Sequence, residues 1–127
     1  MAKASYVRFA TPAEVVEQIY TVLEKSRAGG KLTKGTNEVT KAIERAQAKL
    51  VIIAEDVQPP EVVMHLPVLC EEKKIPYAYA PTKQELGNAA GLSVGSAAIA
   101  ILDEGEGKEL LESIKLKLDE ARGVKNG

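Results

Sequence analysis

Residues 50–54, with the sequence Leu-Val-Ile-Ile-Ala, form the stretch that decides the predicted fold. The run contains no polar side chain, and three of its five residues are β-branched. Uninterrupted apolar runs of this length that are rich in β-branched residues are typical of strands that other elements cover on both faces. We therefore predict that residues 50–54 form a strand inside a sheet with helices on both sides.

Helical and strand patterns alternate on both sides of this central run. Helices are predicted where apolar residues recur every three or four positions, at residues 11–28, 36–48, 59–70, 82–91 and 110–118. Further strands are predicted at residues 31–33, 75–80 and 97–102. Such alternation predicts an α/β fold with a central mixed or parallel sheet between two layers of helices.

Local signals predict where two helices begin and where a third is interrupted. Thr11 with Glu14, and Thr82 with Glu85, have the spacing of a capping box at the start of a helix. Pro67 lies inside the third helical pattern, where proline removes a backbone donor and clashes with the preceding turn. We therefore predict capped helix starts at Thr11 and Thr82, and a break or kink at Pro67.

Length and composition predict one ordinary domain. The chain has 127 residues, of which 45% are hydrophobic and 28% are charged, and this suits a single core. We expect one domain over residues 1–127 that ends in a disordered tail from about residue 122. No apolar run reaches the roughly 20 residues of a membrane span, and the N-terminus lacks the apolar stretch of a signal peptide. A cytoplasmic location is therefore expected.

The scarcity of cysteine and histidine limits the chemistry that the chain can perform. Cys70 and His65 are the only residues of their types, which excludes an intrachain disulfide and a Cys/His zinc cluster. We therefore predict no metal and no cofactor. The formal net charge of -1 does not by itself indicate nucleic-acid binding, so such a function depends on where the charges lie.

Residues 34–46, Lys-Gly-Thr-Asn-Glu-Val-Thr-Lys-Ala-Ile-Glu-Arg-Ala, contain the strongest candidate for a functional site. With about 100° of rotation per helical residue, their side chains separate into two arcs. The polar and charged arc consists of Asn37, Glu38, Lys41 and Arg45. The apolar arc consists of Val39, Ala42, Ile43 and Ala46. We predict that the apolar arc packs on the sheet and that the polar arc faces a partner.

The polar arc has the side-chain types that recognise base edges. Lysine donates to guanine O6 and N7, an amide donates and accepts, and a carboxylate accepts only from base amino or imino groups. Gly35 permits a positive φ before the helix, and a helix N-terminus offers backbone amides to a phosphate. Regular A-form RNA hides its base edges, so a distorted RNA is predicted. The alternative is a solvated helix face whose charges form i,i+3 and i,i+4 pairs.

Motifs along most of the chain resemble one known family. They lie at residues 34–45, 50–57, 65–72, 75–77 and 83–87. Together they resemble the archaeal kink-turn-binding ribosomal proteins of the L7Ae family, from about residue 12 to residue 118. The resemblance implies a three-layer α-β-α sandwich with a central four-stranded mixed sheet. It also implies a protein without catalytic residues that stabilises kink-turn and kink-loop RNA containing sheared G·A pairs.

The resemblance also implies roles for individual residues. The residues implied to contact the sheared G·A pairs are Asn37, Glu38 and Lys41. Those implied to lie against the RNA backbone are Lys34, Gly35 and Thr36. A loop implied to pack its apolar side chains against an extruded nucleotide and neighbouring bases consists of Leu92, Ser93 and Val94. Residues implied to border the same RNA surface are Gln58, Val62 and Lys83.

Two positions depart from the family pattern. Ala46 stands where many relatives have glycine, which puts the shape of that helix end in question. Val94 stands where relatives with a splicing role often have arginine, which implies a broader tolerance among kink-turn RNAs.

The resemblance further implies several ribonucleoprotein assemblies. They are the large ribosomal subunit, the box C/D and H/ACA guide particles, and archaeal RNase P, whose chemistry is tRNA processing. In the box C/D particle, the implied protein partners are a Nop-domain scaffold protein and fibrillarin.

Two other classes of function remain as alternatives. A small α/β enzyme could use Cys70 with His65, or Glu55 with Asp56 at the end of the central strand. For Cys70 and His65 we predict core packing instead, and for Glu55 and Asp56 we predict helix capping or loop solvation. The third class is a protein-only interaction module, which predicts no affinity for RNA.

Overall fold

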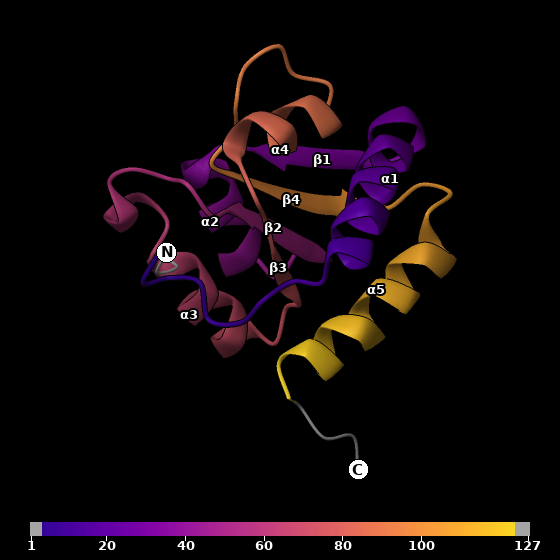
Figure 1. Ribbon diagram of the computed structural model, residues 1–127. Helices are drawn as coiled ribbons and strands as arrows, with labels where there is room; N and C mark the ends of the chain where they lie inside the picture. Colours follow the sequence, from indigo (N-terminus) through magenta and orange to yellow (C-terminus); the bar gives the residue numbers. More distant parts are fainter. Residues whose placement is uncertain (1–3, 124–127) are drawn as a thin grey trace.

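The central strand of the predicted fold, β2 (Leu50–Ala54), lies inside a four-stranded sheet in the computed structural model, which describes residues 4–123 (Figure 1). The strand order is β1-β4-β2-β3. The other strands are β1 (Lys31–Lys34), β3 (Tyr77–Ala80) and β4 (Ala98–Asp103). β2 pairs parallel with β3 and antiparallel with β4, while β1 pairs antiparallel with β4. The sheet is therefore mixed, and all five β2 residues are buried as predicted.

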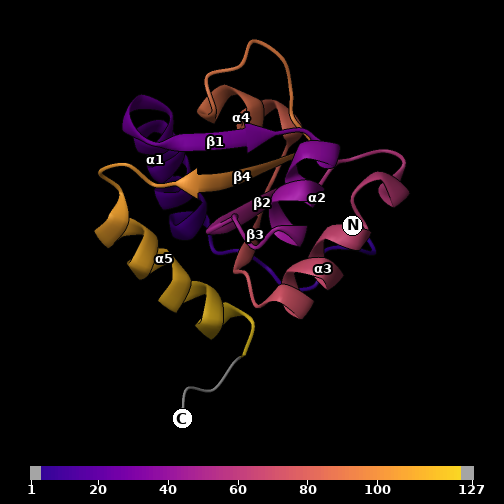
Figure 2. The same cartoon turned by 180° about the vertical axis from the view of Figure 1, so that it is seen from behind.

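Two layers of helices cover the sheet. The five α-helices are α1 (Ala13–Gly29), α2 (Thr36–Glu44), α3 (His65–Lys73), α4 (Lys83–Ala89) and α5 (Lys108–Ala121). α2 and α3 pack together on one face, whereas α1 and α4 lie on the other, with α5 alongside α1 (Figures 1 and 2). This arrangement confirms the three-layer α-β-α sandwich.

Helical stripes of apolar residues attach the outer helices to one shared core. In α1 the fully buried stripe includes Val15, Ile19 and Leu23, and in α5 it includes Ile114 and Leu118. Spacings of three or four residues place such side chains on one side of a helix. No helix among residues 4–123 is both long and apolar enough to cross a membrane.

The two predicted capping boxes have different outcomes. Thr82 caps α4, because its Oγ1 accepts a hydrogen bond from the backbone N–H of Glu85 at 3.1 Å. Thr11 does not cap α1, which begins after Pro12 without a side-chain cap. Instead, Thr11 Oγ1 accepts a hydrogen bond from the backbone N–H of Tyr79 at 3.1 Å. Tyr79 lies on an edge strand whose outward N–H groups need a partner, and this need decides the role of Thr11.

The third helix begins later than predicted. A short 3₁₀ turn, η1 (Pro60–Val62), precedes it, and α3 starts at His65. Pro67 is therefore the third residue of α3, where the backbone N–H has no partner within the helix. The predicted break at Pro67 is wrong for this reason, because proline is tolerated in a first helical turn.

The second helix ends at Glu44, four residues before the predicted end. Ala46 has a φ of +55°, its N–H bonds to Ile43 O, and the N–H of Gln47 bonds to Ala42 O, both at 2.9 Å. These two bonds form a Schellman motif, which usually has glycine at the left-handed position. Ala46 thus adopts the left-handed backbone conformation that glycine usually has at this position. Its side chain is exposed instead of packed on the sheet.

The predicted disordered tail from about residue 122 is wrong at its first residue. The backbone N–H of Arg122 bonds to Leu118 O at 2.9 Å, and its guanidinium lies 5.6 Å from the centre of the Tyr77 ring. Arg122 therefore belongs to the folded structure and not to a tail. The rest of the predicted tail, from residue 124, lies outside the described residues.

Candidate nucleic-acid interface

The strand register brings four loops to one edge of the sheet. Lys34 at the end of β1 pairs opposite Ile99 near the start of β4, while β2 and β3 end side by side at Ala54 and Ala80. The segments that leave this edge are residues 35–37, 55–59, 81–83 and 92–97. We call them together the loop edge. They contain most of the residues that the sequence assigned to RNA.

Backbone hydrogen bonds tie these loops to one another. The N–H of Gly35 donates to Ala98 O at 3.0 Å, and the N–H of Ala54 donates to Ala97 O at 2.9 Å. The N–H of Glu55 donates to Ala80 O at 2.9 Å. Because backbone bonds of this kind fix neighbouring loops to the rigid sheet, side chains on different loops keep constant relative positions.

Asp56 continues this network toward α4. Its Oδ1 accepts a hydrogen bond from the backbone N–H of Lys83 at 2.8 Å, and the carbonyl of Lys83 accepts one from the N–H of Ser96 at 3.0 Å. Asp56 thus caps the first turn of α4, which confirms capping over an acid–base role. Among residues 4–123, no group of three or more His, Cys, Asp or Glu side chains is arranged to hold a metal ion.

The entrance to α2 presents the predicted polar arc. Gly35 has a φ of +91° and turns the chain from β1 into α2, as predicted. Asn37, Glu38 and Lys41 are exposed. Lys41 Nζ lies 3.4 Å from Glu38 Oε1, and both side chains are more than half exposed, at 54% and 59%. The pair is weak in such an exposed setting, so both groups are available to a ligand.

The opposite side of α2 is buried in the expected way. Val39, Ala42 and Ile43 contribute to the core. Thr40 Oγ1 donates to Thr36 O at 2.7 Å and lies 2.8 Å from Nε2 of His65 on α3. His65 is therefore an exposed contact between two helices, and the prediction that it packs in the core is wrong. Its position at the start of α3 turns the ring toward α2.

Arg45 is separated from the rest of the polar arc along the helix axis. It follows the last helical residue of α2, eight positions after Asn37. At 1.5 Å per residue the two positions are about 12 Å apart. The structure therefore brings Asn37, Glu38 and Lys41 together at the loop edge and places Arg45 at the far end of α2.

The loop before β4 exposes an apolar side chain at the same edge. Val94 is 64% exposed, Ser93 is exposed and Leu92 is half-buried. Gly87 makes this loop possible, because a Cβ at Gly87 would lie 2.1 Å from the carbonyl oxygen of Val94. This role of Gly87 was not predicted from the sequence, although a glycine inside a helical pattern often marks such a close approach.

The loop after β2 carries the remaining candidates. Gln58 is exposed, and Val62, the last residue of η1, is 39% exposed. Tyr6 fixes the start of this loop, because its hydroxyl donates to Ala54 O at 2.7 Å and accepts from the N–H of Val57 at 3.0 Å. This role of Tyr6 was not predicted, since nothing in the sequence around it indicates so distant a partner.

A known protein family matches most of this chain. The model of the ribosomal protein L7Ae/L30e/S12e/Gadd45 family matches residues 17–111. The chain belongs to this family. The match confirms the family suggested by the sequence motifs, and it includes the loop edge and all of α2.

A solved structure shares the whole fold with this family member. It is the Giardia lamblia 15.5kD RNA binding protein, which is 26% identical and superimposes with a TM-score of 0.85. The similarity covers 96% of this chain and 99% of the other. The L7Ae-type architecture therefore extends beyond the segment that the family model matches.

The suggested Cys–His enzyme site is not formed in this family member. Cys70 is fully buried, and burial raises the pKa of its thiol to about 12. A thiol with this pKa stays protonated near neutrality and is a poor nucleophile. His65 contacts Thr40 through its Nε2, so the two residues do not form a nucleophile–base pair.

Proposed function

We propose that this chain binds kink-turn and kink-loop RNA through the loop edge and the entrance to α2. Membership of a ribosomal-protein family and similarity to an RNA-binding protein support RNA binding and not catalysis. The observation that carries the finer proposal is the placement of Asn37, Glu38 and Lys41 at the same sheet edge as the exposed Val94.

Selectivity for sheared G·A pairs follows from the chemistry of the α2 entrance. Glu38 only accepts hydrogen bonds and repels phosphate, so its partners are base amino or imino groups. Lys41 donates to guanine O6 or N7, and Asn37 donates or accepts. The i,i+3 spacing of Glu38 and Lys41 places both heads on one side of α2, and their exposed ion pair is weak enough for RNA to replace.

The other loops supply contacts that only a kinked RNA can make at the same time. Val94 and Leu92 offer apolar surface to an extruded nucleotide, with Ser93 between them. The positions that face the RNA backbone are Lys34, Gly35 and Thr36. Gln58, Val62 and Lys83 border the same surface. Arg45 reaches only an RNA that continues along α2, so its contact is with a flanking phosphate.

The proposed mechanism is a shift of population. A protein that binds the kinked conformer more tightly than the extended one enriches the kinked conformer. As a single domain, the chain would then serve as an early component of the large ribosomal subunit and of box C/D and H/ACA guide particles. A Nop-domain scaffold protein and fibrillarin would join it in the box C/D particle, and archaeal RNase P is a further assembly. These roles place it in the cytoplasm.

A gel-shift titration with two RNAs tests the proposal. One RNA contains a kink-turn, and its partner replaces the two sheared G·A pairs with Watson–Crick pairs while keeping length and charge. We expect a loss of about 2–6 kcal/mol for the second RNA, because each good base contact discriminates by about 1–3 kcal/mol. Equal affinity for both RNAs would overturn the kink-turn proposal and leave only general RNA binding.

A further inference from the structure

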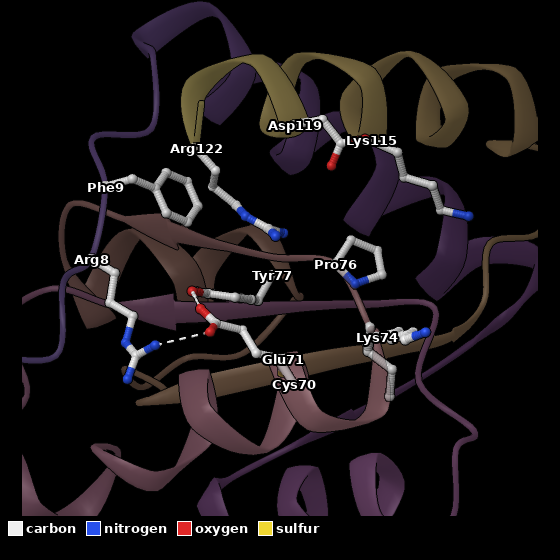
Figure 3. Close-up of a pocket in the computed structure, with 11 residues that line it drawn as sticks. Arg8, Phe9, Cys70, Glu71, Lys74, Pro76, Tyr77, Lys115, Asp119 and Arg122 are labelled. Atoms are coloured by element: carbon white, nitrogen blue, oxygen red, sulfur yellow. Dashed lines mark hydrogen bonds and ion pairs between the residues drawn. The ribbon is translucent and has the colours of Figure 1, made fainter. Parts of the chain in front are cut away.

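A pocket of about 670 Å³ opens at the sheet edge opposite the loop edge (Figure 3). It lies between the C-terminal end of α3, the last turns of α5 and the N-terminal segment at Arg8 and Phe9. Tyr77, the first residue of β3, lies at its centre. The loop edge begins after Ala80, the last residue of β3, so about 10 Å of strand separates the two surfaces.

Basic side chains are concentrated around this pocket. Four cations line it: Arg8, Lys74, Lys115 and Arg122. Only two carboxylates, those of Glu71 and Asp119, accompany them. The pocket therefore has an excess of two positive charges, whereas the whole chain has a net charge of -1.

Contacts within the protein neutralise only part of the positive charge of this pocket. Glu71 accepts a hydrogen bond from the Tyr77 hydroxyl at 2.5 Å and forms an ion pair with Arg8 Nη1 at 3.0 Å. Lys74 and Arg122 have no ion pair within 4.0 Å among residues 4–123, although Arg122 lies over the Tyr77 ring. Within the part of the chain that the structure describes, Lys74 and Arg122 thus remain without a carboxylate in ion-pair contact on opposite sides of the pocket, although the charge of Arg122 helps to lower the pKa of Glu71.

The remaining surface of the pocket distinguishes between kinds of anion. Phe9, Pro76 and Tyr77 provide apolar walls. Asp119 and the C-terminal ends of α3 and α5 add negative charge or partial negative charge beside the cations. Phosphate groups themselves gain nothing from apolar walls, and a continuous row of them meets Asp119, whereas a peptide can place its carboxylates away from that side chain. An extended peptide with spaced carboxylates, apolar side chains and N–H donors satisfies all three features.

We propose that this pocket docks an acidic, apolar peptide segment of a protein partner. Carboxylates of the segment pair with Lys74 and Arg122, apolar side chains cover Phe9 and Pro76, and a backbone N–H donates to Asp119. The pocket and the loop edge lie at opposite ends of β3, so a protein and an RNA can be bound at the same time. The inference does not depend on which RNA occupies the loop edge.

Selection from a phage-displayed library of random 12-residue peptides tests the proposal. The library is first depleted on the Lys74→Glu/Arg122→Glu variant and then selected on the wild-type chain. Binding of enriched synthetic peptides is measured by fluorescence anisotropy. The control variant, Lys73→Glu/Lys108→Glu, reverses two exposed charges on α3 and α5, the helices that Lys74 and Arg122 follow, at positions that do not line the pocket.

We expect enriched peptides to combine acidic and apolar residues and to bind the pocket variant about tenfold more weakly or worse, as for reversed charge pairs at an interface. The control variant should bind them like the wild type. Enrichment of peptides without acidic residues, no enrichment, or equal binding by both variants would overturn the proposal. The same variants are also titrated with hexauridylate, a short single-stranded RNA. If the wild type and the control variant bind it and the pocket variant does not, the pocket is a site for RNA and the proposal is overturned.

Two measurements keep these outcomes interpretable. Circular dichroism and thermal unfolding establish that each variant is folded. If the Lys74→Glu/Arg122→Glu variant does not fold, Lys74→Gln/Arg122→Gln is used in its place. Affinity for the kink-turn RNA, measured on the same variants, reports on the loop edge alone. Loss of peptide binding with intact RNA binding therefore distinguishes the two proposals.

Discussion

Oδ1 of Asp56 accepts a hydrogen bond from the backbone N–H of Lys83 at 2.8 Å, which joins the loop after β2 to the first turn of α4. Through the bond from Ser96 N–H to Lys83 O, the same contact extends to the loop before β4. One exposed carboxylate thus takes part in linking three of the four segments of the loop edge.

Replacement of Asp56 by alanine should loosen the loop edge. We expect the free energy of unfolding to fall by about 1 kcal/mol, as for loss of a helix cap. RNA affinity should fall as well, because the loops that carry Lys83 and Val94 lose their shared anchor. Urea denaturation and gel-shift titration measure the two effects. Asp103→Ala is the matched control, since Asp103 Oδ1 also accepts a loop N–H, from Gly105 at 2.9 Å, at the opposite sheet edge.

Glu38→Ala and Lys41→Ala should each weaken binding of kink-turn RNA by about 1–3 kcal/mol and reduce its preference over the Watson–Crick control RNA. Each change removes one hydrogen-bonding head from the α2 entrance. Gel-shift titration with both RNAs measures the effect. Glu112→Ala is the control, because Glu112 forms the same i,i+3 pair with Lys115, at 3.1 Å, on α5. If neither α2 variant changes affinity, the proposed reading face is wrong.

Ala46→Gly should stabilise the protein by about 1 kcal/mol, because a left-handed backbone costs a residue with a Cβ about 1–2 kcal/mol and glycine gives back part of this in chain entropy. The positive φ of Ala46 is the reason for the expected sign. Urea denaturation measures the change. In contrast, Ala28→Gly, which lies within α1, should destabilise the protein by about 0.5–1 kcal/mol. A loss of stability in both variants would contradict the prediction.

Tyr77→Phe should change how stability depends on pH. The hydrogen bond from the Tyr77 hydroxyl, and then the Arg8 guanidinium, hold the pKa of Glu71 below its ordinary value. A carboxyl whose pKa is lowered by folding stabilises the protein above the pKa of the unfolded state, and this contribution disappears as pH falls through the folded pKa. The variant should therefore be less stable than the wild type near neutrality, and the difference should shrink in acid.

Unfolding in urea at pH 6 and at pH 3 measures this effect, together with a ¹³C titration of the Glu71 carboxyl. Because Glu71 is exposed over 42% of its side chain, we expect a contribution below about 1 kcal/mol. In a Glu71→Gln background, the effect of Tyr77→Phe should no longer depend on pH. A pH dependence that persists in this background would assign the effect to another group.

Cys70 should be unreactive in the folded protein. Its thiol is fully buried, and burial raises its pKa to about 12, so the thiolate needed for attack is scarce at pH 8. Labelling with a thiol reagent should be slow in buffer and complete in urea. Rapid labelling of the native chain would reopen the enzyme alternative.

The sequence by itself determined the order of helices and strands, because apolar periodicity is a local property that burial enforces. Residues 50–54 could only be a strand covered on both faces, and α5 could only bury its apolar stripe. It also separated the exposed and buried arcs of α2 between Asn37 and Ile43. The family motifs then indicated the residues of the proposed RNA-binding surface before any geometry was known.

Only the tertiary structure decided which polar groups satisfy which backbone atoms. Thr11 and Tyr6 form hydrogen bonds with distant strand residues, Tyr79 and Ala54, and no local pattern encodes a partner 48 or more residues away. Pro67 is harmless because of where α3 begins, and Ala46 adopts a glycine conformation because two backbone bonds hold it there. The packed tertiary structure decides hydrogen-bond partners and helix ends, because the free-energy cost of one unpaired buried polar group exceeds the free energy of a local conformational preference.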